Sequence, residues 1–148
     1  MIALIQRVSK GSVTIEEKLL SSIDHGYVIL LGIFKEDTEQ DIEKLIPKIL
    51  HLRVMNDENG VMNKSILETN GELLVVSQFT LCADTRKGRR PSYINAMRPE
   101  SAKTLYELFI RQLTRENIPV KTGVFGGLMR VEVINDGPVT ILLNSSQL

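Results

Sequence analysis

The chain has 148 residues and a mass of 16.6 kDa, a length that allows one compact domain and argues against two. With 43% hydrophobic and 24% charged residues, its composition excludes a disordered, a collagen-like and a disulfide-rich chain. Eighteen basic residues balance eighteen acidic ones, which disfavours a polyanion binder held by a positive field over its whole surface.

Cysteine usage and the N-terminal sequence bear on the compartment. The single cysteine, Cys82, cannot form an internal disulfide, a CxxC motif or a four-cysteine zinc site, so we expect a reducing compartment and no structural metal. The N-terminal sequence lacks the order of a signal peptide, and the longest apolar run, residues 27–34, is far shorter than the roughly 20 residues of a membrane span. We therefore expect a cytoplasmic protein without a membrane span.

The first part of the chain predicts three strands. Residues 2–8 are rich in β-branched side chains and residues 12–16 alternate between polar and apolar, which predicts a hairpin with its turn at Lys10-Gly11. Residues 27–34 are apolar on both faces, as in a central strand that is covered on two sides.

A helix follows these strands. Residues 38–41 resemble a capping box, and apolar side chains then recur at helical spacing up to residue 50. Pro47 falls inside this pattern and is expected to bend the helix or to cost about 3 kcal/mol.

The rest of the chain predicts four strands and one further helix, which Pro99 opens at its first position. The strands are expected at residues 52–55, 72–80, 128–134 and 139–143, and the helix at residues 99–117. Because regular strand–helix–strand units are absent, this order predicts an α/β fold in which a mixed or antiparallel sheet carries two helices. An aliphatic core is expected, since the chain has no tryptophan and only 5% aromatic residues.

Common catalytic and ligand-binding motifs are missing. The sequence contains no P-loop, no dinucleotide fingerprint, no HExxH and no EF-hand loop. Its only histidines, His25 and His51, stand at a strand entry and at a helix end, where structural roles are the usual ones. A Ser-His-Asp triad is therefore poorly supplied, and any hydrolysis has to use other means.

Four segments place polar or conformationally special residues beside apolar strands. Each has an ordinary structural interpretation, namely a strand end, a solvated loop, glycine turns and a tight turn. Each also has a functional interpretation. The first segment, residues 77–80, can expose backbone N–H groups, and the second, residues 86–91, can contact phosphates. The third, residues 123–129, can line a ligand site, and the fourth, residues 135–140, contains a Gly-Pro bond.

Taken in order and at these distances, the segments closely resemble the D-aminoacyl-tRNA deacylase family, also called D-tyrosyl-tRNA deacylase. The resemblance covers essentially the whole chain and includes the residue runs 5–8, 77–81, 87–92, 122–126 and 135–140. Gly127 stands where alanine is usual and Tyr93 where phenylalanine is frequent, and these departures affect only the fine shape of a pocket.

The resemblance implies a fold and a function. The fold is a single α/β domain over residues 1–148, with a curved, barrel-like, mixed and largely antiparallel sheet and two main helices, as in D-tyrosyl-tRNA deacylases. The activity is hydrolysis of the ester that links a D-amino acid, or glycine mischarged on tRNA(Ala), to the 3′ end of tRNA. The implied enzyme is a cytoplasmic homodimer without a cofactor or a metal, with its active sites at the dimer interface.

The resemblance also assigns residues to roles. Backbone N–H groups near Phe79 and Thr80 become oxyanion donors, and a cis Gly137-Pro138 bond enters the partner's pocket to reject L-amino acids sterically. The implied catalytic residues are Ser77, Gln78, Phe79 and Thr80. Substrate binding and L-rejection fall to Gly137, Pro138, Phe125 and Met129, and support or tRNA contact falls to Arg7, Arg89 and Arg90.

Thr80 is the candidate nucleophile by position, but its motif contains no base that can deprotonate it. We therefore favour hydrolysis assisted by the ribose 2′-hydroxyl of the tRNA, with Thr80 as a positioning group. Two alternatives stay open: a non-catalytic RNA-binding module that shares the fold, and an esterase or amidase for small acyl substrates with Thr80 as nucleophile.

Overall fold

The computed structural model, which describes residues 1–148, is built around one long strand, β1 (Ile2–Ile15). The early part of β1 pairs antiparallel with β3 (Gly26–Gly32), and the late part pairs antiparallel with β2 (Lys18–Ile23) along the same edge. On the other edge, β8 (Arg130–Asn144) pairs antiparallel with almost the whole of β1. Because two strands share one edge of β1, the sheet has to bend along that strand.

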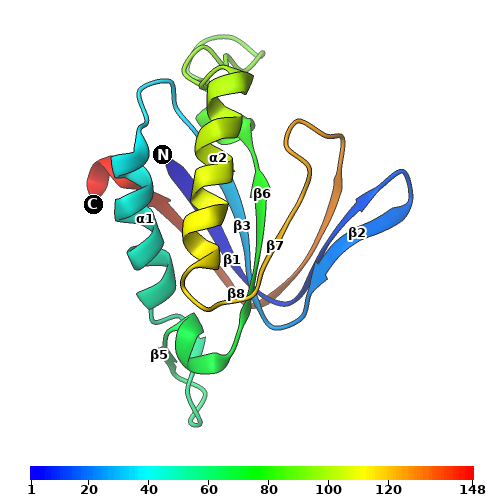
Figure 1. Ribbon diagram of the computed structural model, residues 1–148, viewed down its shortest axis with the longest axis vertical. Coiled ribbons are helices and arrows are strands. Elements are labelled where there is room, and N and C mark those ends of the chain that lie inside the picture. Colours follow the sequence, from blue (N-terminus) through cyan, green and yellow to red (C-terminus); the bar gives the residue numbers. More distant parts are fainter.

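The remaining strands curl the sheet towards closure. β3 pairs parallel with β6 (Glu72–Ser77), and β6 pairs parallel with β7 (Val120–Thr122). β2 returns to β7, where the Ser21 hydroxyl donates a hydrogen bond to the Thr122 carbonyl at 2.9 Å. The expected fold is confirmed, since the sheet is mixed, largely antiparallel and nearly closed into a barrel (Figure 1).

Two helices, α1 (Glu39–His51) and α2 (Pro99–Thr114), cover one face of the sheet (Figure 1). The predicted capping box is present, with the Thr38 N–H donating to Asp41 Oδ2 at 2.8 Å. α1 continues through Pro47, whose exposed position leaves the missing backbone bond on the side that faces water. Neither helix is long and apolar enough to cross a membrane.

Short elements complete the chain. β4 (Met55–Asn56) and β5 (Met62–Lys64) form a separate two-stranded hairpin, which lies at the opposite end of the molecule from the loop before α2 (Figure 1). The 3₁₀ turns are Ile66–Thr69, Phe79–Cys82 and Ser145–Gln147.

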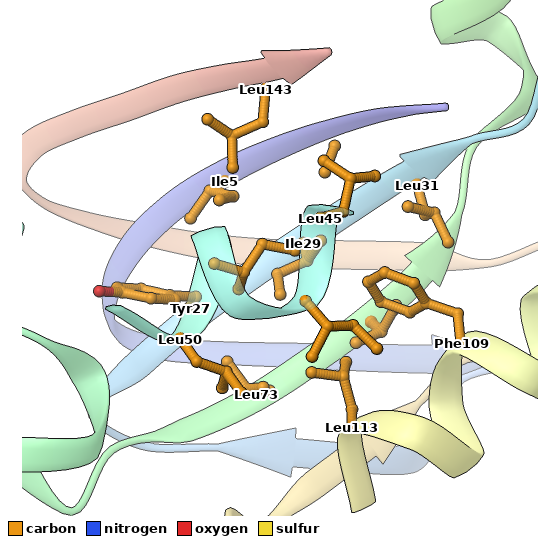
Figure 2. Close-up of a cluster of buried hydrophobic side chains, with 14 of the residues drawn as sticks. Ile5, Tyr27, Ile29, Leu31, Leu45, Leu50, Leu73, Phe109, Leu113 and Leu143 are labelled. Atoms are coloured by element: carbon orange, nitrogen blue, oxygen red, sulfur yellow. The ribbon is translucent and has the colours of Figure 1, made fainter. Parts of the chain in front are cut away.

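Apolar side chains form two buried clusters. The larger joins both helices to the sheet, and Figure 2 shows Leu45, Leu50, Phe109 and Leu113 gathered around strand residues such as Ile29. The smaller fills the barrel with six aliphatic side chains: Val8, Val13, Ile23, Val28, Leu74 and Val76. The core is mainly aliphatic, as the composition predicts.

The predicted hairpin at Lys10-Gly11 is wrong. β1 runs through these residues without a break, and the turn lies at Glu16 and Glu17, which both have positive φ. Gly11 is inside the barrel wall, where a Cβ would lie 2.5 Å from Val28 Cγ2. This glycine therefore permits a close approach between strands and does not form a turn.

Other predicted boundaries also differ from the structure, including that of the central strand, which is predicted at residues 27–34 and observed as Gly26–Gly32. The strand predicted at residues 52–55 shrinks to Met55–Asn56, and the strand predicted at 72–80 ends at Ser77, because Phe79–Cys82 is a 3₁₀ turn. The second helix ends at Thr114, three residues early, and the strands predicted at 128–134 and 139–143 are one strand, β8. The sequence patterns also miss β2, β5 and β7.

Candidate active site

A cavity of about 600 Å³ opens between the end of β6, the loop before α2 and residues 125–131. Twelve of its eighteen lining residues are hydrophobic, so its walls are apolar with a few polar groups. It brings together five of the predicted site residues from distant parts of the chain: Ser77, Gln78, Phe79, Phe125 and Met129. Apolar walls with few polar groups are typical of a small-molecule binding site.

The end of β6 presents backbone donors beside this cavity. The Gln78 N–H still donates to the Leu31 carbonyl at 2.8 Å, and the chain then enters the 3₁₀ turn. The first bond of that turn runs from the Leu81 N–H to the Gln78 carbonyl at 3.2 Å, so the N–H groups of Phe79 and Thr80 have no acceptor within the turn. Two adjacent free donors suit an oxygen on which negative charge develops.

The Thr80 side chain is exposed and lies outside the residues that line the cavity. Its hydroxyl accepts a hydrogen bond from the side-chain amide of Gln78, and no histidine, lysine or carboxylate contacts it. Neither His25 nor His51 lines the cavity. The arrangement gives the Thr80 hydroxyl a donor as its neighbour and supplies no base.

Aromatic rings and the start of α2 form part of the cavity wall. The rings of Phe79 and Tyr93 meet edge to face with their centroids 5.0 Å apart, and Phe125 lies 5.7 Å from the ring of Tyr106. Sequence reasoning missed most of the other lining residues, among them Met97, Arg98 and Leu128. The predicted helix start at Pro99 was the available signal for the first two, since residues before a helix often border a site.

The segment that carries Gly137 and Pro138 is a protrusion from β8. Thr140 pairs with Gln6 and Asn135 pairs with Val8, so residues 136–139 all stand opposite one residue of β1, Arg7. We call residues 136–139 the β8 bulge. The predicted tight turn thus exists as a bulge within one strand, and its Gly137-Pro138 peptide bond is cis, as the resemblance implies.

Arg7, on the neighbouring strand β1, supports the β8 bulge through a hydrogen bond. Only 4% of its surface is exposed, and its Nε–H donates to the Asp136 carbonyl at 3.0 Å. Asn135 closes the bulge from the strand side, because its Oδ1 accepts from the Val139 N–H at 2.9 Å. Arg7 is therefore placed to prop the bulge.

Within one chain, the β8 bulge and the cavity are apart. Gly137 and Pro138 are exposed and neither lines the cavity. Arg7 joins the bulge to Asn56 of the β4–β5 hairpin, and Figure 1 shows this hairpin and the loop before α2 at opposite ends of the molecule. The structure therefore leaves the two predicted halves of the site unassembled in a single chain.

The basic loop before α2 has a free tip. Asp84 pairs with Ser92 across the loop and accepts hydrogen bonds from Arg86, which lower the pKa of the Asp84 carboxyl to about 2. Arg86 is thus neutralised within the chain. The cations at the tip are exposed and have no acidic partner: Lys87, Arg89 and Arg90.

Comparisons with known proteins extend this description. A model of the D-Tyr-tRNA(Tyr) deacylase family matches residues 4–144. A D-aminoacyl-tRNA deacylase of Thermosipho africanus is 51% identical over 147 residues, which cover 99% of both chains. A D-aminoacyl-tRNA deacylase of Persephonella marina is 53% identical over 148 residues, which cover 100% of both chains.

Solved structures with the same fold are also known. One, described as c-Myc DNA Unwinding Element Binding Protein, superposes with a TM-score of 0.93 and 44% identity over 97% of this chain and 98% of that chain. A probable eukaryotic D-amino acid tRNA deacylase superposes with a TM-score of 0.82 over 96% and 97% of the two chains. At 15% identity, the second likeness concerns the fold alone.

Proposed function

The chain belongs to the D-Tyr-tRNA(Tyr) deacylase family, and we propose how it acts as a D-aminoacyl-tRNA deacylase, a hydrolase of the ester between amino acid and tRNA. The cavity receives the 3′-terminal adenosine with its amino acid. The observation that carries this proposal is the pair of free N–H groups at Phe79 and Thr80 beside an apolar cavity. We place the reaction in the cytoplasm, where translation supplies aminoacyl-tRNA.

The proposed chemistry needs no protein nucleophile. Water adds to the ester carbonyl carbon, and the carbonyl oxygen gains its negative charge next to the N–H groups of Phe79 and Thr80. The bond to the ribose 3′-oxygen then breaks, and that oxygen takes up the proton that the water releases. The neighbouring ribose 2′-hydroxyl orients and activates the water, while Thr80 and Gln78 fix the shape of the strand end.

We propose that two chains form the active enzyme. β8 is paired on one edge only, and an unpaired edge of fifteen residues is a ready surface for a second copy. Large apolar side chains are exposed on and beside it, with exposed fractions of 94% at Leu128, 47% at Ile134 and 56% at Leu142. A two-fold pairing can also bring the β8 bulge of one chain to the cavity of the other.

We propose that the β8 bulge of the partner selects the D-configuration. Its backbone carbonyls hold the α-ammonium group of the substrate while the ester is held at the free N–H groups. With both ends fixed, the side chain of an L-amino acid meets the backbone, whereas that of a D-amino acid points into open space. Glycine has no side chain to reject, so glycine mischarged on tRNA(Ala) is also accepted.

Catalytic amounts of the chain are expected to release D-tyrosine quickly from D-tyrosyl-tRNA and to leave L-tyrosyl-tRNA intact. The measurement follows both esters side by side. Equal loss of the two esters would favour an esterase for small acyl groups. Loss of neither would favour an RNA-binding module without activity.

Reversing the charges of Arg89 and Arg90 is expected to weaken tRNA binding by roughly tenfold at low salt, since exposed cations attract the phosphate backbone. The double variant Arg89→Glu, Arg90→Glu is compared with the wild type by filter binding over a series of salt concentrations. Lys48→Glu, on the exposed side of α1, serves as the control. Unchanged affinity at low salt would remove the basic loop from the tRNA contact.

A further inference from the structure

The guanidinium group of Arg7 is bound on two sides. Its Nε–H donates to the Asp136 carbonyl of the β8 bulge at 3.0 Å. On the other side, its Nη1 donates to the Val54 carbonyl at 2.7 Å and to Asn56 Oδ1 at 2.9 Å. Three bonds to one planar group fix both its position and its plane.

We propose that Asn56 is a positioning residue for deacylation, acting through Arg7 on the β8 bulge. The inference rests on the proposed function of that bulge. Of the three acceptors around Arg7, two are backbone carbonyls, which are present whatever the side chain is. Asn56 is the one side chain that accepts a hydrogen bond from Arg7, and the Asp136 carboxylate adds only an ion-pair contact, with Oδ2 at 3.6 Å from Nε. The residue at position 56 therefore contributes to the orientation of Arg7.

A small movement of the Arg7 guanidinium would displace the β8 bulge, because the two are in direct contact. A Cβ built on Gly137 would lie 2.7 Å from Nη2 of Arg7, so the guanidinium is packed against the glycine with no free space. A rotation of the guanidinium plane therefore moves Nη2 relative to Gly137. Asn56 Oδ1 and the Val54 carbonyl resist this rotation together, because both accept a hydrogen bond from Nη1, on the side away from the bulge.

The chain holds Asn56 firmly enough for this role. Its neighbour Met55 is fully buried in the main core, and Asn56 itself pairs with Met62 in the β4–β5 hairpin. The hairpin is pinned at its base, where Arg53 Nε donates to the Asn63 carbonyl at 2.7 Å. Asn56 is thus held in a fixed position relative to the core, and its side chain can hold Arg7 in a fixed position.

Substitutions at Asn56 test the hydrogen-bond acceptor while leaving the other site residues unchanged. Asn56→Ala removes the acceptor at an exposed position, so this variant is expected to fold. Asn56→Asp keeps an oxygen in the same place and adds a charge that pairs with the guanidinium. Asn59→Ala makes the same change in the same hairpin at a side chain that bonds nothing, since Asn59 donates only its backbone N–H, to Asp57.

The experiment measures kcat and KM for D-tyrosyl-tRNA, release of tyrosine from L-tyrosyl-tRNA, affinity for uncharged tRNA and the thermal midpoint. We expect Asn56→Ala to lower kcat about tenfold, the effect of losing one hydrogen bond to a charged group, with unchanged affinity for uncharged tRNA. Asn56→Asp is expected to stay within about twofold of the wild type, since it preserves such a bond. Asn59→Ala is expected to match the wild type in every measurement.

Two results would overturn the inference while the enzyme stays active on D-tyrosyl-tRNA. One is a wild-type kcat in Asn56→Ala. The other is an equal loss of kcat in Asn56→Ala and Asn56→Asp, because the acceptor oxygen would then be irrelevant. A wild-type chain that leaves D-tyrosyl-tRNA intact overturns the proposed function itself, and with it this inference.

Discussion

A D-aminoacyl-tRNA that ends in 2′-deoxyadenosine is expected to be hydrolysed roughly 100- to 1000-fold more slowly than the normal substrate, within the usual range for losing an acid–base group. The reason is that the chain places no general base at the cavity. The Thr80 hydroxyl has the Gln78 amide as its neighbour, and no protein base lies beside the free N–H groups of Phe79 and Thr80. The ribose 2′-hydroxyl is then the group left to activate water.

The matching protein variant is Thr80→Ala, which is expected to retain activity within a few-fold of the wild type. Both measurements use single-turnover release of the amino acid, with affinity for uncharged tRNA as a check that binding is intact. A fully inactive but folded Thr80→Ala, together with normal hydrolysis of the deoxy substrate, would contradict the mechanism. That pair of results would support a covalent route through Thr80.

Local patterns predicted the helices and the central strand well. The apolar spacing that begins at Ile42 and the capping residues before it define α1, and Pro99 marks the start of α2. These signals involve residues a few positions apart, so they can be read from one segment alone. The buried strand β3 was evident for the same reason, because a run that is apolar on both faces needs cover on both sides.

The curvature of the sheet was not evident from any one segment. Gly11 resembles a turn residue in the sequence, and only the approach of Val28 from another strand explains why a glycine stands there. The closing contact from Ser21 to Thr122 joins residues 101 positions apart. Such long-range contacts have no periodicity that a sequence pattern can reveal.

Some residues of the candidate site were likewise evident from the sequence, and others were not. The short run from Ser77 to Phe79 and the glycine-rich run before Met129 stood out in the sequence, and both line the cavity. Asn56 did not stand out, because it sits in a turn-rich stretch and its contact with Arg7 spans 49 positions. Supporting residues of this kind become visible only when the fold places them beside a site residue.

Gly137→Ala is expected to lower kcat/KM for D-tyrosyl-tRNA about 100-fold, the loss that a displacement of about 1 Å commonly produces. Gly137 has a φ of +122°, in a region that side chains rarely adopt. An added Cβ would lie 2.7 Å from Arg7 Nη2 and 2.9 Å from Val139 Cγ2, so either the β8 bulge or Arg7 has to move. The strained backbone is also expected to lower the free energy of unfolding by about 1–3 kcal/mol.

Gly60→Ala is the matched control for this variant. Gly60 also has a positive φ, +76°, but a Cβ there would meet nothing within 4 Å, and its place in the β4–β5 hairpin turn keeps it away from the cavity. We expect full activity from Gly60→Ala. The value of kcat/KM and the free energy of unfolding in urea are measured for both variants. If a folded Gly137→Ala matched Gly60→Ala in kcat/KM, the β8 bulge would have no part in catalysis, since a change that moves the bulge would then leave the reaction untouched.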